Sequence, residues 1–120
     1  MARYVTLSTL AKLNAKVRTP AWCPNAYAWA RRRFRRLWGN TRVPITRANI
    51  YRWLNTRTEA GRYAADDALV RWLDAVYGYA AGDEYWNVPG VHARYTDEWD
   101  RGAQQRLARV FCRIVNSRGG

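Results

Sequence analysis

The residues of this chain that are best spaced for chemistry are arginines. Five of them, from Arg31 to Arg36, lie within residues 30–38, interleaved with apolar and aromatic side chains. A run this dense repels itself, and a guanidinium group binds phosphate through a fork of hydrogen bonds. We therefore expect an anionic partner against this run. The residues predicted to bind phosphate are Arg31, Arg32, Arg35, Arg36 and Arg42.

A second set of candidate residues lies on the short helix predicted over residues 46–55, which Thr46 is expected to cap. Its outward face combines arginine, asparagine and tyrosine, which read base edges, stack on bases or contact phosphate. The residues predicted to read bases are Arg47, Asn49, Tyr51 and Arg52. A third set, Arg106, Arg109 and Arg113, either extends the basic surface or complements the dipole at the end of the last helix.

The charge of the chain is distributed unevenly along its length. The net charge is +12, of which residues 1–58 carry +13 and contain no Asp or Glu, whereas residues 59–120 carry −1. A half without acids has no internal counter-charge, which indicates a polyanionic partner, with nucleic acid as the first choice. An acidic protein surface and a face that serves only solubility are the alternatives.

The sequence contains no pattern that predicts catalysis or metal binding. Its single histidine, His92, has no cysteine or histidine at metal-ligand spacing. Cys23 and Cys112 stand alone, which predicts two reduced thiols. The adjacent acids at 66–67 and 97–98 open predicted helices, where the helix dipole explains them. Those at 83–84 form an interaction patch or dock on the chain's own arginines. We expect no enzyme, no cofactor and no metal.

Apolar spacing predicts an all-α single domain of about five helices over residues 1–120. The helices are expected at residues 5–17, 25–38, 46–55, 64–77 and from 96 onward, with fraying at 117–120. Residues 56–63 and 78–95 are predicted loops, the second with one helical turn around 83–86. Aromatic side chains at 79–95 are a candidate homodimer contact, because large exposed apolar patches often mark one.

Each predicted helix has an apolar face that indicates the core. In residues 25–38 this face is Ala26, Ala30, Phe34 and Leu37, with the stem of Arg33 packed beside it and its head in water. The next two faces are Ile50, Trp53 and Leu54, and then Ala65, Ala68, Leu69, Trp72, Leu73 and Val76. The last is Trp99, Ala103, Leu107, Val110, Phe111 and Ile114.

The stretch Ile45–Asn55 resembles the recognition helices of small helix-turn-helix proteins of the resolvase, excisionase or MerR-like type. Residues 61–63 and 67–73 look like the wing remnant and following helix of that group, and residues 4–13 are similar to excisionase-like starts. The resemblance implies that Arg47, Asn49, Tyr51 and Arg52 face the major groove of DNA. The chain departs from the group at Pro44, where glycine is usual, and in having a longer turn.

These observations predict a small basic DNA-binding protein with a helix-turn-helix core and a regulatory role. The arginines of residues 31–36 are expected to bind the phosphates of the DNA. RNA is the less favoured target, with exposed aromatics stacked on unpaired bases. The alternative is a phage-type or mobile-element-type protein that docks on a host protein and inhibits it. No apolar run is long enough to span a membrane, and the start lacks a secretion signal. We therefore expect a cytoplasmic protein.

Overall fold

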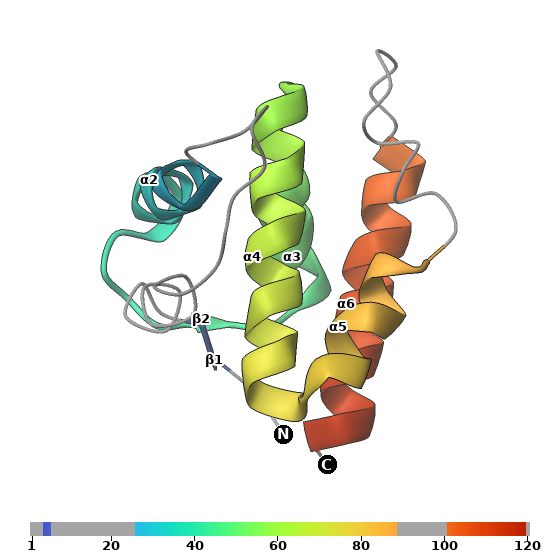
Figure 1. The fold of residues 1–120 in the computed structure, drawn as a ribbon. Helices are drawn as coiled ribbons and strands as arrows, with labels where there is room; N and C mark the ends of the chain where they lie inside the picture. Colours follow the sequence, from blue (N-terminus) through green and yellow to red (C-terminus); the bar gives the residue numbers. More distant parts are fainter. Residues whose placement is uncertain (1–3, 6–25, 89–100, 120) are drawn as a thin grey trace.

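Helices build the fold in the computed structural model, which describes residues 4–5, 26–88 and 101–119. The elements are β1 (Tyr4–Val5), α2 (Ala26–Trp38), β2 (Val43–Pro44), α3 (Arg47–Leu54), α4 (Glu59–Tyr77), α5 (Tyr79–Trp86) and α6 (Arg101–Gly119). Figure 1 shows α4 at the centre, with α2 on one side, α5 and α6 on the other, and α3 behind it. This arrangement confirms the all-α single domain.

Two very short strands join the N-terminal part of the chain to the segment before α3. Tyr4 lies opposite Pro44 and Val5 opposite Val43 in an antiparallel pair. The helix predicted from Val5 is therefore wrong at its first residue, because tyrosine and valine favour extended backbone and Pro44 is tolerated at a sheet edge. The rest of that predicted helix lies outside the described residues.

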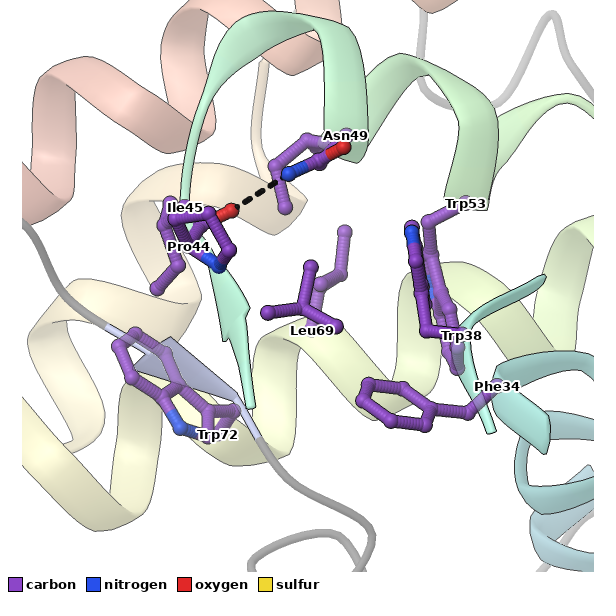
Figure 2. A pocket seen from close by; sticks show the side chains of 10 residues that line it. Phe34, Trp38, Pro44, Ile45, Asn49, Trp53, Leu69 and Trp72 are labelled. Carbon is purple, nitrogen blue, oxygen red and sulfur yellow. Dashed lines mark hydrogen bonds between the residues drawn. The ribbon is translucent and has the colours of Figure 1, made fainter. Parts of the chain in front are cut away.

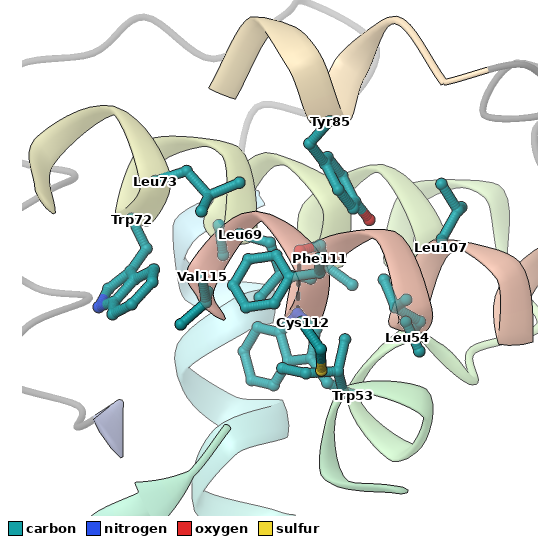
Figure 3. Close-up of a cluster of buried hydrophobic side chains, with 14 of the residues drawn as sticks. Trp53, Leu54, Leu69, Trp72, Leu73, Tyr85, Leu107, Phe111, Cys112 and Val115 are labelled. Atoms are coloured by element: carbon teal, nitrogen blue, oxygen red, sulfur yellow. Dashed lines mark hydrogen bonds between the residues drawn. The ribbon is translucent and has the colours of Figure 1, made fainter. Parts of the chain in front are cut away.

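The hydrophobic core lies where the buried faces of α3, α4, α5 and α6 meet (Figure 3). The predicted faces are confirmed for α3 and, within residues 101–119, for α6. On α4 the prediction is wrong at Val76, which is 43 % exposed because it lies in the last turn before the break at Gly78. The indole N–H of Trp53 donates to the carbonyl of Ala65 at 2.9 Å, so the buried tryptophan keeps its polar atom paired.

An aromatic cluster fixes α2 against α3. Trp38 of α2 stacks on Trp53 of α3, with ring centroids 6.1 Å apart and planes 9° apart. Phe34 meets both rings edge-on, at 5.1 and 6.0 Å (Figure 2). Each such pair contributes about 0.5–1.5 kcal/mol beyond the burial of its area. The rings line an apolar cavity of about 20 Å³. Their contacts hold the arginine-rich helix α2 against α3.

Threonine caps decide where two of the helices begin. The hydroxyl of Thr46 accepts from the backbone N–H of Asn49, which confirms the predicted cap of α3. Thr58 accepts in the same way from Gly61, so α4 begins at Glu59. The loop predicted at 56–63 is therefore confirmed at 56–58 and wrong at 59–63. Gly61 had indicated a loop, but a Cβ there would lie 2.7 Å from the Thr58 hydroxyl. It is a close-packing residue inside a helix.

The loop predicted at 78–95 is wrong at 79–82, where α5 follows α4 after Gly78, and its one predicted helical turn around 83–86 is confirmed as the C-terminal half of α5. Gly78, at φ +98°, makes the break between the two helices. Gly82 lies in α5 where a Cβ would be 1.9 Å from a carboxylate oxygen of Asp74, so only glycine allows this approach. Tyr85 is fully buried, and its hydroxyl donates to Asp66 at 2.7 Å. Of the described aromatic residues proposed as a dimer contact, Tyr79 is exposed and Trp86 is half-buried.

The paired acids take roles other than opening helices. Because α4 begins at Glu59, Asp66 and Asp67 lie inside the helix, and their placement in its first turn was wrong. Asp67 does pair with Arg71 as predicted, at 2.9 Å. Burial raises the pKa of Asp67, and Arg71 offsets part of that rise. Glu84 pairs with Arg118 at 3.2 Å, which confirms docking on the chain's own arginine.

Arg118, the partner of Glu84, lies in the last turn of α6, where residues 117–120 were expected to fray. Instead, α6 continues through Gly119. Residues 97–98 lie outside the described range, as do His92, Cys23 and Trp99. Cys112 is buried as a free thiol, in agreement with the prediction for that residue.

Candidate nucleic-acid interface

The exposed side of α2 carries four arginines, which with Arg52 of α3 we call the α2 patch. Arg31, Arg32, Arg35 and Arg36 are all exposed, while Ala26, Ala30 and Phe34 are buried on the opposite side. The described parts of the chain place no carboxylate in ion-pair contact with any of these four. Within the described residues, these four guanidinium groups are therefore open to an anionic ligand.

Arg33 has a different role from its neighbours. Its Nε donates to the carbonyl of Trp53 at 2.7 Å, and its Nη2 donates to the carbonyls of Asn55, at 3.0 Å, and Arg52. The last carbonyls of a helix have no partner within the helix, so Arg33 acts as a cap on the C-terminal end of α3. The prediction that its head lies in water is wrong, because these carbonyls are within reach of the packed stem.

The position of Arg33 also shows how close the positive charges stand. Burial lowers the pKa of Arg33, and the nearby charges of Arg36 and Arg52 lower it further. Arg52 is itself exposed, with its guanidinium carbon 5.8 Å from the ring centroid of Trp38. The C-terminal end of α3 thus belongs to the same basic surface as α2.

The four predicted base readers of α3 differ in how available they are. Arg47 and Arg52 are exposed at the two ends of the helix. Asn49 is half-buried, and its side-chain N–H donates to the carbonyl of Pro44 at 2.9 Å (Figure 2). Tyr51 is half-buried against the core. The outward surface of α3 is therefore formed mainly by Arg47, Ala48, Arg52 and Asn55, which are exposed.

The predicted third stripe meets the N-terminal end of α3. Arg106, Arg109 and Arg113 are exposed on α6 and line an open groove of about 870 Å³ together with Arg47. We call this hollow, which these four arginines line, the α6 groove. Arg106 and Arg109 lie in the middle of α6, beyond the last turn to which the helix dipole effect is confined. Dipole complementarity therefore does not account for them, and extension of the basic surface does.

The α6 groove also contains the one buried thiol that the structure describes. Cys112 lines the groove, and burial raises its pKa while the charge of Arg47 lowers it in part. A thiol held in its neutral form is a poor nucleophile. Cys112 also belongs to the hydrophobic core, so it contributes to packing.

Arg42 lies apart from both arginine groups. It is exposed just before β2, and its guanidinium carbon is 4.9 Å from the ring centroid of Tyr4 in β1. Cation–π contact of this kind holds the side chain against the strand pair. The structure therefore places four of the five predicted phosphate-binding residues together on α2, and the fifth on the connection to α3.

Three carboxylates are gathered between α4 and α5. Asp67, Asp74 and Asp83 line a pocket between α4 and α5, with Tyr63, Tyr79 and Trp86 around them. No arginine lines this pocket within the described chain. The described residues contain no group of three or more His, Cys, Asp or Glu side chains placed to share a metal ion.

Comparison with known proteins adds no family to this description. The chain matches no family model, no curated protein and no solved structure. Among the described helices, none combines the length and apolar character that crossing a membrane requires. The function must therefore be argued from the arginines and from the helix that lies between them.

Proposed function

We propose that this chain binds duplex DNA, with α3 at the major groove and the arginines of α2 and α6 on the phosphates at its edges. The supporting observation is that the exposed surface of α3 has an arginine at each end, and neither arginine makes an ion pair with another described residue. Arg52 continues into the α2 patch, and Arg47 continues into the α6 groove. The proposal keeps the role that the helix-turn-helix resemblance implies for α3, and it adds α6 to the contact.

The dimensions of α3 agree with this use. Its eight residues make about two turns, and a helix with its side chains is about 10–12 Å in diameter. The major groove of B-DNA is about 12 Å wide and admits a single helix. With basic elements next to both ends of α3, phosphates on either side of the groove are within reach of guanidinium groups. Most of the affinity then comes from phosphate neutralisation, and sequence selection falls to Arg47, Arg52 and Asn55.

A protein that occupies a DNA site without catalysing a reaction acts by blocking or recruiting other proteins at that site, and we propose a regulatory role of this kind. Duplex DNA is favoured over RNA because an A-form RNA helix has a major groove too narrow for side chains to read. This choice concerns α3 alone, since the phosphate contacts carry no sequence information and suit either polymer.

The test is a salt series of binding to a labelled blunt duplex, with neutralising variants in each arginine group. Each phosphate contact contributes about 0.9 to the slope of log affinity against log salt. We expect Arg32→Gln/Arg36→Gln and Arg106→Gln/Arg109→Gln each to reduce the slope by about 2. Arg118→Gln is the matched control, because Arg118 is exposed but paired with Glu84, and we expect it to keep the wild-type slope.

A wild-type protein that fails to bind duplex at low salt, or whose affinity is independent of salt, would refute the proposal. Loss of slope in the α2 variant alone would confine the interface to α2 and remove α6 from it. Capture of one stoichiometric host protein from nuclease-treated lysate, without DNA binding by the pure chain, would favour the host-protein inhibitor instead.

A further inference from the structure

Trp29 is an exposed tryptophan on the arginine-bearing helix, and sequence analysis had not singled it out. Its residue is 37 % exposed. The guanidinium carbon of Arg32 lies 5.8 Å from the centroid of its ring. Tryptophan is a large side chain that is usually well buried, and this indole lies on the surface of a cationic helix where a ligand can reach it.

The spacing along α2 puts this ring in line with the phosphate-binding arginines. Trp29, Arg32 and Arg36 are separated by three and four residues, so they follow one another along one side of the helix. From Trp29 to Arg36 the helix rises by about 10 Å, which corresponds to about three nucleotides of one strand at 3.4 Å each. Arg36 in turn stands near Arg33, whose guanidinium group binds the carbonyls at the C-terminal end of α3. A strand that leaves α3 along the α2 patch therefore reaches Trp29.

An indole ring beside a guanidinium group is suited to binding a nucleobase by stacking. Bases stack on exposed aromatic rings in proteins that bind single strands, and arginine adds a cation–π contribution. The faces of bases inside a duplex are already stacked, so the base on Trp29 has to be unpaired. The other arginine–tryptophan contact described here, Arg52 with Trp38, is less suited because Trp38 is half-buried and stacked on Trp53.

We propose that Trp29 and Arg32 form a stacking site for an unpaired nucleobase, so that the protein binds most tightly where a duplex gives way to a single strand. This inference rests on the proposed function, since the duplex portion is held by α3 and the arginines. It adds the class of nucleic acid that the site selects, and it assigns Trp29 a role in recognition.

The experiment compares a blunt duplex with the same duplex carrying a short single-stranded overhang, using fluorescence anisotropy. Stacking of one base is worth about tenfold in affinity. We expect wild type to prefer the overhang substrate by about that factor, Trp29→Ala to bind both substrates equally, and Trp29→Phe to keep part of the preference. Tyr79→Ala is the matched control, because Tyr79 is 79 % exposed but lies on α5, outside the α2 patch. It is expected to keep the full preference.

The outcomes separate the two proposals. No binding to either substrate refutes the proposed function. Tight binding of both substrates without a preference, or a preference that Trp29→Ala retains, overturns the stacking site and leaves duplex binding intact. Overhangs of DNA and of RNA are both used, because an unpaired base of either can stack, and the tighter one identifies the natural source. A circular dichroism melt confirms that each variant is folded.

Discussion

Replacing Arg33 should destabilise the protein much more than replacing its neighbour Arg36. Arg33 donates to three carbonyls at the end of α3, and Arg36 is exposed, without an ion pair in the described chain. A hydrogen bond from a charged group contributes about 1.5–3 kcal/mol when buried. The bond to Trp53 is part-buried and the other two are exposed, so the total loss for Arg33→Met should be about 2–3 kcal/mol.

The assay is urea unfolding followed by far-UV circular dichroism. Methionine keeps the apolar stem, so the difference reports the guanidinium contacts. Arg33→Lys should lose roughly half as much, because an ammonium group lacks the planar fork. Arg36→Met is the control and should leave the midpoint nearly unchanged, since an exposed unpaired charge contributes little. Equal midpoints for Arg33→Met and Arg36→Met would refute the assignment of Arg33 as the cap of α3.

Three further substitutions test the packing of the core. Gln104 is fully buried, and its side-chain amide finds no partner in the described residues; Gln104→Met should raise the unfolding free energy by about 1–2 kcal/mol, and a loss of stability in urea would contradict this. Tyr85→Phe removes the hydroxyl that donates to buried Asp66 and should cost about 1–3 kcal/mol in the same assay. Burial raises the pKa of Asp74, an effect that the backbone of Gly82 partly offsets and Asp83 reinforces. A raised pKa favours the neutral carboxyl in the folded state. Asp74→Asn should therefore stabilise the protein at neutral pH by less than about 1 kcal/mol, with the gain disappearing below the ordinary carboxyl pKa, as thermal melts across pH would show.

Local signals in the sequence were enough to predict α2 and α3. Their apolar residues recur at helical spacing, Thr46 caps α3, and Gly39 at φ +65° ends α2. These features depend on residues a few positions apart, so they can be recognised without knowing the fold. The exposed arginines of α2 followed directly from the same periodicity.

Features that depend on distant contacts could not be predicted in this way. Gly61 and Gly82 read as loop residues, yet each lies inside a helix because a neighbour packs against its missing side chain. Arg33 was placed at the edge of the apolar stripe, but its acceptors lie about twenty residues further along. The meeting of Arg47 with the arginines of α6 joins two segments that nothing in the sequence relates.

The separation of charge across α4 has a kinetic consequence. The pocket lined by Asp67, Asp74 and Asp83 lies between α4 and α5, whereas α3, the helix that carries Arg47 and Arg52, lies behind α4 (Figure 1). Arg71 offsets the charge of Asp67, so Asp74 and Asp83 are the remaining acids of this pocket. Because the helices pack into one body, these acids and the arginines of α3 are held apart and give the molecule an electric dipole. The electric field of a polyanion orients such a molecule before contact, so that α3 faces the polyanion and α5 faces away from it. Association should then be faster than random collision allows, and it should slow steeply as salt shortens the range of the field.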